Sequence, residues 1–282
     1  MTDDGGIAGS ASCGGIADSA RSGTVTTSRV DGILHVTLDR PSRRNSLSPP
    51  MVDAFVDALT DAATDDSLRA IHIRGGGSDF CAGVDWVTAN SGERPRTGDL
   101  VRRVPHGAHR VIELVHTIHL PVVCSVRGWA AGLGCNLALA ADFTIAGTDA
   151  VFWEPFLDRG FSPDSGSSWL LPRLVGLARA KSMLLLGEKV SGSDAADWGL
   201  IHRCVDDSEV DDVATELLAR LASGPTVAIG LAKQAIHYVQ HATLPQTMTQ
   251  ELFNLELSCR TKDFKEGLAA FREKRTPEFG GR

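Results

Sequence analysis

Short apolar runs alternate with longer amphipathic segments through the first half of the chain. Runs typical of strands cover residues 33–38, 71–74, 122–126 and 143–146, and apolar positions at helical spacing fill 51–62. Strands separated in this way by helical segments are typical of a parallel sheet with crossover helices. The pattern therefore predicts an α/β fold.

The second half of the chain is mostly helical in pattern. Ser48 is the expected N-cap of the first helix, because Pro49 and Pro50 follow it at positions where a missing N–H is tolerated. Residues 87–105 are polar and rich in Gly and Pro, so we expect a long loop. The other expected helices cover residues 106–118, 134–141, 178–186, 193–198, 210–222, 225–241 and 249–275.

Two glycine-bearing segments each follow a predicted strand directly. The first is FCAGVD at 80–85, and the second is GWAAGLGCN at 128–136. Both are typical of sharp strand-to-helix turns, in which glycine allows close backbone approach and the leading helix N–H groups stay unpaired. Two such turns facing one cavity would direct two backbone donors at one point. That arrangement is an oxyanion hole, which predicts enolate or acyl chemistry.

Composition excludes several classes of protein. The 28 basic and 35 acidic residues give a formal charge of −7, which disfavours a nucleic-acid partner. No run approaches the ~18 apolar residues of a membrane span. The six cysteines lack CxxC spacing, so we expect reduced thiols and a cytoplasmic protein. Residues 1–23 are small and polar without a basic start, and they are expected to form a disordered tail rather than a secretory signal.

The ordered set of motifs resembles the crotonase superfamily, which includes the enoyl-CoA hydratases and isomerases. The resemblance runs from about residue 30 to the C-terminus. It implies a crotonase (ClpP-like) spiral of ββα units over 24–222 and a helical trimerisation region over 223–282, giving a homotrimer or a hexamer. The motifs are LDRP at 38–41, NSL at 45–47, the two glycine segments, PDSGSS at 163–168, LPRLVG at 171–176, AADWGL at 195–200 and EGLAAFREKR at 266–275.

The resemblance also implies which groups form the oxyanion hole. They are the backbone N–H groups of Val84 and Leu133, which hold the negative charge that develops on a thioester oxygen. Leucine at the second position departs from the usual glycine, but only the N–H is needed. The alternative is that both turns simply connect strands to helices.

The acid–base group is less clear than the hole. Related hydratases of fatty-acid metabolism use two glutamates, and the matching positions here hold Asn136 and Phe156, which do not ionise. Asp164 is the preferred base, because an aspartate at this motif position is the nucleophile in related 4-chlorobenzoyl-CoA dehalogenases. Asp164 is alternatively an N-cap of the next helix, which is expected to start from Ser167. Glu154 is a second candidate, provided that its loop shifts register.

Recognition of coenzyme A requires cations, because the cofactor carries phosphates. By resemblance, Arg43 and Arg44 contact these phosphates, the Ala82 carbonyl accepts from the adenine amine, Phe271 packs on the adenine, and Lys274 joins from a neighbouring subunit. For the two arginines a solvated loop is the alternative. Coenzyme A enters as part of an acyl-CoA thioester substrate, and no permanently bound cofactor is expected.

Other candidate sites carry less weight. Four histidines at 106, 109, 116 and 119 suggest a metal site at first, but no carboxylate or cysteine completes a ligand set, so none is expected. Gly132 and Gly134 lack a third glycine at dinucleotide spacing. Trp86, Trp153 and Phe156 are candidates either for an acyl pocket or for ordinary core packing.

The sequence therefore favours an acyl-CoA enzyme that stabilises a thioester enolate and shifts a double bond by proton transfer. Two alternatives stay open. One is a hydratase or thioesterase in which Glu154 or Asp164 activates water. The other is a catalytically silent acyl-CoA-binding homologue, which the missing glutamates permit.

Overall fold

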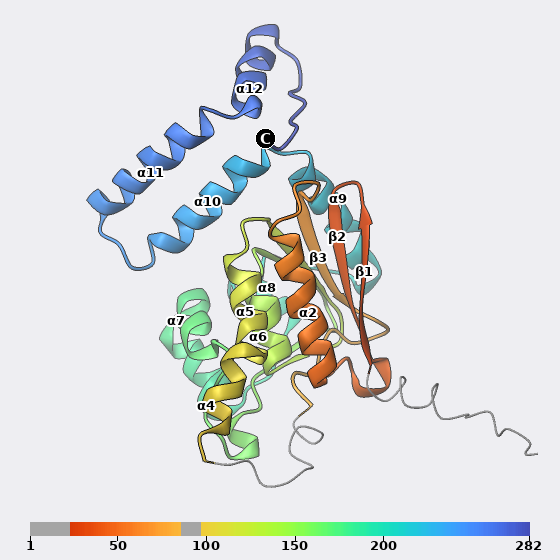
Figure 1. Cartoon of the computed structure of the whole chain (residues 1–282). Coiled ribbons are helices and arrows are strands. Elements are labelled where there is room, and N and C mark those ends of the chain that lie inside the picture. Colours follow the sequence, from red (N-terminus) through yellow and green to blue (C-terminus); the bar gives the residue numbers. More distant parts are fainter. Residues whose placement is uncertain (1–22, 86–96) are drawn as a thin grey trace, which may run out of the picture.

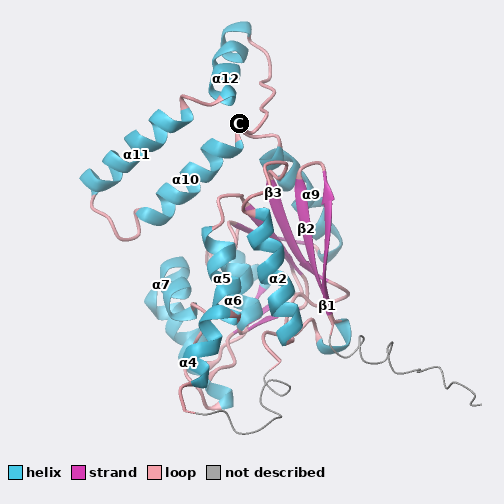
Figure 2. Cartoon of the chain, viewed as in Figure 1, coloured by secondary structure: helices cyan, strands magenta, loops and turns pink. Residues whose placement is uncertain are grey.

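A six-stranded sheet forms the centre of the molecule (Figures 1 and 2). The computed structural model describes residues 23–85 and 97–282, so the expectations for residues 1–22 and for Trp86 lie outside it. The strand order is β1-β2-β3-β4-β6-β9, with β1 antiparallel to β2 and every later neighbour parallel. The strands are β1 Thr24–Val30, β2 Ile33–Asp39, β3 Ala70–Gly75, β4 Val122–Val126, β6 Phe143–Gly147 and β9 Arg203–Val205.

A second, three-stranded sheet lies where the functional turns are. It consists of β5 (Trp129–Ala131), β7 (Val151–Trp153) and β8 (Val190–Ser191), with β5 parallel to β7 and β8 antiparallel to it. This small sheet was not expected, because its strands are two or three residues long. Such short segments carry too little alternation to be distinguished from turns.

Helices cover both faces of the large sheet. The α-helices are α2 Pro49–Ala62, α4 Asp99–Arg103, α5 Ala108–Thr117, α6 Leu133–Ala140, α7 Ser167–Leu186, α8 Gly192–Asp197, α9 Val210–Ala222, α10 Thr226–Tyr238, α11 Leu244–Ser258 and α12 Lys262–Glu273. Within the described residues, four short 3₁₀ turns occur at η1 Pro41–Arg43, η2 Val104–His106, η3 Leu157–Arg159 and η4 Asp207–Glu209.

Burial explains this layering. All five residues of β4 are buried, as in a strand covered on both faces. On one face, α9 contributes Val210, Ala214 and Leu218 to a cluster with sheet residues. On the other face, α2, α5 and α6 bury their apolar sides in the main core, where Phe55 of α2 is fully buried.

The last three helices extend away from the sheet in Figure 1. Buried Lys233 of α10 fixes them to the body, because its Nζ lies 2.7 Å from Asp142 Oδ2 and also donates to two backbone carbonyls. α11 and α12 expose many large apolar side chains, among them Phe253 at 63% and Phe271 at 85%. The domain boundary at 222/223 stays a prediction.

Three expectations need correction. β1 was missed, because most of its side chains are exposed and its apolar alternation is weak. Residues 99–106 are helical rather than loop, as α4 and η2, which are each too short to show periodicity. The single helix expected over 249–275 is two helices, because Thr261 caps α12 by accepting from Phe264 N–H.

Candidate functional site

Backbone hydrogen bonds join the two glycine turns side by side. Cys81 N–H donates to Trp129 O and Ala131 N–H donates to Cys81 O, each at 2.9 Å. The contact requires glycine, because a Cβ on Gly134 would lie 2.1 Å from Cys81 O. A Cβ on Gly83 would lie 2.8 Å from Ala131 O, and Gly83 also has a positive φ of 91°. The sequence expectation that the two turns face one another therefore agrees with the structure.

Val84 lies in the first turn, beside Leu47. Leu47 N–H donates to Gly83 O at 2.8 Å, and Asp85 N–H donates to Leu47 O at 3.0 Å. Successive backbone groups of an extended segment point to opposite sides, so Val84 N–H points away from Leu47. It has no hydrogen-bond partner in the described part of the chain. Residues 86–96, which follow this turn, lie outside the described residues.

Leu133 is the first residue of α6. Its N–H is one of the leading donors that an α-helix leaves unpaired, at the end where the helix dipole favours negative charge. Gly132, the N-cap, has a φ of 52°, a backbone conformation that suits glycine. The second turn thus places Leu133 N–H at a helix N-terminus, with the short strand β5 between β4 and the helix, and its role as an oxyanion-hole donor stays a prediction.

One small cavity brings these groups together with Asp164. Its lining includes Val84 and Leu133 with Asp164, and also Arg159 and Phe156. Asp164 is half-buried, and its Oδ1 accepts a 2.6 Å hydrogen bond from Ser165 Oγ. Among the described residues that line this cavity, Asp164 is the only carboxylate.

The N-cap alternative for Asp164 concerns the start of α7. That helix begins at Ser167 as expected, but its N-cap is Gly166 and no side chain caps it. Asp164 contributes its backbone carbonyl instead, which accepts from both Ser167 N–H and Ser167 Oγ. The Asp164 carboxylate therefore takes no part in capping α7, and Asp164 is among the residues that line the cavity.

A larger cleft, with a mostly apolar lining, also includes Asp164. It has a volume of 560 Å³, in the range of ligand sites, and its lining includes Leu100, Val104, His109 and Phe161. Sequence analysis missed α4 as a wall because residues 87–105 were expected to be a loop. Phe156 lines the small cavity. Trp153 instead packs against Trp129, at a ring-centroid distance of 5.7 Å.

The first turn is anchored by side chains whose role sequence analysis recognised only in part. Asp85 forms a buried 2.8 Å ion pair with Arg40. Asn45 is fully buried. Its Oδ1 accepts from Arg40 N–H, and its Nδ2 donates to Gly76 O and Asp79 O. The signal for this anchor was the LDRP…NSL motif itself.

Glu154 lies behind the site rather than in it. Its side chain is fully buried and it does not line the cavity. Burial raises its pKa well above the ordinary 4.5; the side chains of Cys135 and Asn136 oppose this only in part, and the charge of Asp164 adds to it. The structure thus gives no sign of the register shift on which its catalytic role depended.

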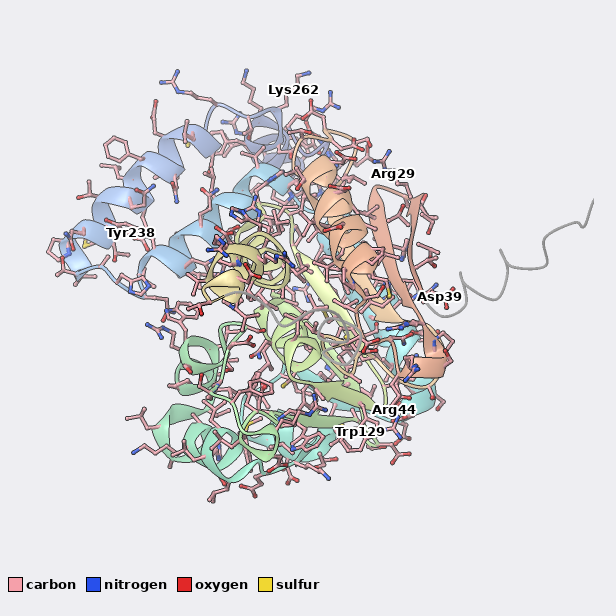
Figure 3. The ribbon with its side chains drawn as sticks, turned by 60° about the horizontal axis from the view of Figure 1, so that its bottom comes forward. Arg29, Asp39, Arg44, Trp129, Tyr238 and Lys262 are labelled. Carbon is pink, nitrogen blue, oxygen red and sulfur yellow. The ribbon has the colours of Figure 1, made fainter. Side chains whose placement is uncertain are left out.

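The expected coenzyme A contacts fall into two groups. Arg43, Arg44 and Ala82 lie together, because Ala82 N–H donates to Arg44 O at 2.9 Å. Both arginines are exposed, and the Arg44 guanidinium lies 5.4 Å from the Trp129 ring centre. Phe271 and Lys274 are on α12 and just after it, at the opposite end of the molecule. In Figure 3, Arg44 and Trp129 lie far from Lys262, which begins α12.

Metal ligation and membrane insertion can both be considered for the described residues. Nowhere in 23–85 and 97–282 do three His, Cys, Asp or Glu side chains gather as metal ligands would. The helices of these ranges are also too short or too polar to cross a membrane.

Comparisons with known proteins agree with this geometry. The family described as "Enoyl-CoA hydratase/isomerase" matches residues 28–282. The chain is 38% identical over 251 residues to 1,2-epoxyphenylacetyl-CoA isomerase of Escherichia coli, covering 89% of this chain and 96% of the relative. It is 37% identical to a probable enoyl-CoA hydratase of Rhodobacter capsulatus, with 89% and 96% covered.

A solved structure extends the likeness to the fold. The crystal structure of an enoyl-CoA hydratase/isomerase family protein from Mycobacterium abscessus superposes with a TM-score of 0.87 at 33% identity, covering 92% of this chain and 100% of the other. The predicted crotonase fold is thereby confirmed. With the paired turns, the cavity and a match spanning residues 28–282, the chain belongs to the enoyl-CoA hydratase/isomerase family.

Proposed function

We propose that this protein is an enoyl-CoA isomerase that moves one proton between carbons of an acyl-CoA thioester. The observation that carries the proposal is the cavity in which Asp164 lies with Val84 and Leu133, because one base and two backbone donors are what a proton shift through an enolate needs. The 1,2-epoxyphenylacetyl-CoA isomerase likeness supports it. Cytoplasmic location stays a prediction.

The reaction divides into two proton transfers. The Asp164 carboxylate removes a proton from the carbon alpha to the thioester carbonyl of a 3-enoyl-CoA, and the electron pair of that C–H bond delocalises onto the thioester oxygen. Val84 N–H and Leu133 N–H hold that oxygen, each stabilising the charge by about 2.7–4 kcal/mol by analogy with hydrolases. Asp164 then returns the same proton to the other end of the allylic system. Ser165 Oγ holds the carboxylate in one orientation throughout.

Hydration by a two-carboxylate route is disfavoured by the same residues. Asn136 is fully buried and Phe156 is 3% exposed, and neither ionises to handle a water molecule. Glu154, the other acid in the neighbourhood, is enclosed and does not reach the cavity.

Asp164→Asn separates isomerase from hydratase and from a silent homologue. Crotonyl-CoA and 3-enoyl-CoA are offered to the wild type and to the variant, and solvent deuterium in the product is followed by mass spectrometry. Isomerisation that falls with Asp164→Asn supports the proposal. Isomerisation that survives unchanged contradicts it, hydration of crotonyl-CoA in its place indicates a hydratase, and tight binding without turnover indicates a silent homologue. Asp158→Asn is the matched control, because Asp158 lies on η3 outside the cavity.

We also propose that the coenzyme A moiety spans two copies of the chain, in a homotrimer or hexamer. Arg43, Arg44 and Ala82 come from one copy, whereas Phe271 and Lys274 are too distant and would come from its neighbour. The exposed apolar side chains of α11, such as Leu252 and Phe253, give such an assembly its buried surface.

Light scattering and coenzyme A affinity test this assembly. Phe253→Glu is expected to shift the mass toward a monomer, and Lys274→Ala to weaken coenzyme A binding without changing the mass. Lys262→Ala, at the other end of α12 and also exposed, is the control for the loss of one charge. A wild type that is monomeric and binds coenzyme A normally would contradict the shared site.

A further inference from the structure

Behind the oxyanion hole is a buried polar cluster that the reaction above does not use. Glu154 and Asn136 are both fully buried, and Cys135 lies beside them. Both carboxyl oxygens of Glu154 lack a hydrogen-bond partner of good geometry among the described residues, and so does Asn136 Oδ1, although the side chains of Cys135 and Asn136 lie close enough to Glu154 to lower its pKa in part. Buried polar atoms left unpaired are costly, so each needs an explanation.

All of the unpaired atoms are hydrogen-bond acceptors when Glu154 is ionised. An ionised carboxylate has no proton to donate, and the amide oxygen of Asn136 has none either. Two acceptors enclosed together without a donor repel one another. A proton on Glu154 reverses this, because the carboxylic acid then donates from one oxygen and still accepts at the other, where the Cys135 thiol is a weak donor.

The cluster connects directly to the oxyanion hole. Asn136 Nδ2 donates to Gly132 O at 3.2 Å, and Asn136 N–H donates to the same oxygen at 3.0 Å. Gly132 O and Leu133 N–H belong to one peptide unit. A donor on the oxygen draws electron density from the peptide nitrogen, so the opposite N–H becomes a stronger donor through the cooperativity of linked hydrogen bonds.

We propose that Glu154 is held as a neutral carboxylic acid that donates to Asn136 Oδ1, and that it thereby positions and polarises the Gly132–Leu133 peptide whose N–H faces the cavity. Glu154 is a positioning residue, since it touches neither substrate nor reacting atoms. The catalytic part of this inference rests on the proposed acyl-CoA function, whereas the protonation state of Glu154 does not.

The neighbouring charged group agrees with this assignment. The charge of Asp164, which lines the cavity, disfavours the ionised form of Glu154. A neutral Glu154 leaves Asp164 free to act as the base. The two carboxyl groups therefore divide the roles, one staying protonated for structure and the other moving the proton.

Two substitutions separate hydrogen bonding from packing. Glu154→Gln keeps a donor and an acceptor in a similar shape, and we expect kcat within about twofold of the wild type. Glu154→Met keeps volume but removes the donor, and we expect kcat about tenfold lower with KM changed less than about twofold. Glu216→Met, on the exposed surface of α9, is the matched control.

Infrared spectroscopy reads the proposed state without any ligand. The wild type minus Glu154→Gln difference spectrum at neutral pH should contain the carbonyl stretch of a protonated carboxylic acid. Carboxylate bands in its place would overturn the inference and leave the proposed function intact. This comparison stays decisive even if Glu154→Met fails to fold.

The carbonyl stretch of a bound acyl-CoA tests whether Glu154 strengthens the Leu133 N–H as a donor. In a complex with a saturated acyl-CoA, the thioester carbonyl stretch should lie at lower frequency in the wild type and Glu154→Gln than in Glu154→Met. Equal frequencies and equal kcat in all three would overturn the positioning role. If the wild type binds no acyl-CoA, the proposed function fails, and the catalytic part of this inference fails with it.

Discussion

Glu154 and Asp164 lie on the same connection between β7 and α7, yet the fold gives them opposite surroundings. Asp164 is half-buried, hydrogen-bonded by Ser165 and exposed to the cavity. Glu154 is fully buried with both oxygens unpaired. Leu133 lines the cavity together with Asp164, and the carbonyl oxygen of the preceding residue, Gly132, accepts from Asn136, which lies beside Glu154. Surroundings rather than residue type decide which acid does chemistry.

The largest effect should come from removing the acid on the cavity side. Asp164→Asn keeps the shape but no longer accepts a proton, and a positioned acid–base group contributes roughly 10²–10⁴-fold. We expect kcat for isomerisation to fall by about that factor in a steady-state assay, with coenzyme A affinity retained. A fall of less than about threefold would mean that another group carries the proton.

The N–H side of the shared peptide is tested by Leu133→Pro. Leu133 is the first residue of α6, where proline is tolerated, so the variant removes the donor and keeps the helix. Loss of one hole donor typically costs about 10²–10³ in kcat. Leu133→Ala retains the N–H and should stay close to wild type. Similar rates for the two variants would argue against this donor.

Glu154, behind the oxyanion hole, predicts that the stability of the folded protein depends on pH. The pKa of Glu154 is raised in the folded protein, so above the ordinary value of 4.5 the unfolded chain binds fewer protons than the folded one. Stability from this group therefore declines as pH rises from that value toward the folded pKa, by at most about 1.4 kcal/mol per pH unit.

Glu154→Gln should remove this decline. The free energy of unfolding of the variant, relative to that of the wild type, should therefore increase between about pH 5 and 8, an interval above the ordinary pKa of 4.5. Urea titrations across that interval measure the difference. Parallel pH curves for the two proteins would mean that Glu154 ionises in the folded state as it does in the unfolded chain.

The smallest effect should come from Ser165→Ala. This variant removes the 2.6 Å hydrogen bond to Asp164 Oδ1 but leaves the carboxylate in the cavity. One hydrogen bond contributes about 0.5–1.5 kcal/mol, so kcat should fall by no more than about tenfold. Measured beside Asp164→Asn, it separates orientation of the base from its presence. A loss as large as that of Asp164→Asn would place Ser165 itself among the reacting groups.

Much of the fold could be predicted from the sequence because many of its strands and helices have a local hydrophobic pattern. The strands at 33–38, 71–74, 122–126 and 143–146 agree with β2, β3, β4 and β6, since buried parallel strands are continuous apolar runs. β1 and α4 were missed because an exposed edge strand and a five-residue helix lack such runs. The extra sheet of β5, β7 and β8 depends on pairing between distant segments, which no local pattern contains.

The candidate site divides in the same way. The shared cavity of Val84 and Leu133 agrees with the two glycine turns in the sequence, because such turns fix the backbone whatever the side chains do, while the donor role of the two N–H groups stays a prediction. The larger cleft was not predictable, because it forms between α4 and residues 161–164, far apart along the chain. The two-part division of the coenzyme A contacts also required the placement of α12.

The sequence by itself determined the two turns, the family resemblance and the absence of the usual glutamates at 136 and 156. It placed Asp164 and Glu154 on one list of candidates, because both are acids near the motif. Only the tertiary structure separated them. Trp153 O accepts from Gly132 N–H, and this pairing of β5 and β7 encloses the next residue, Glu154, in the interior beside Asn136. Asp164 follows η3 into the cavity, and burial of this kind arises from long-range packing.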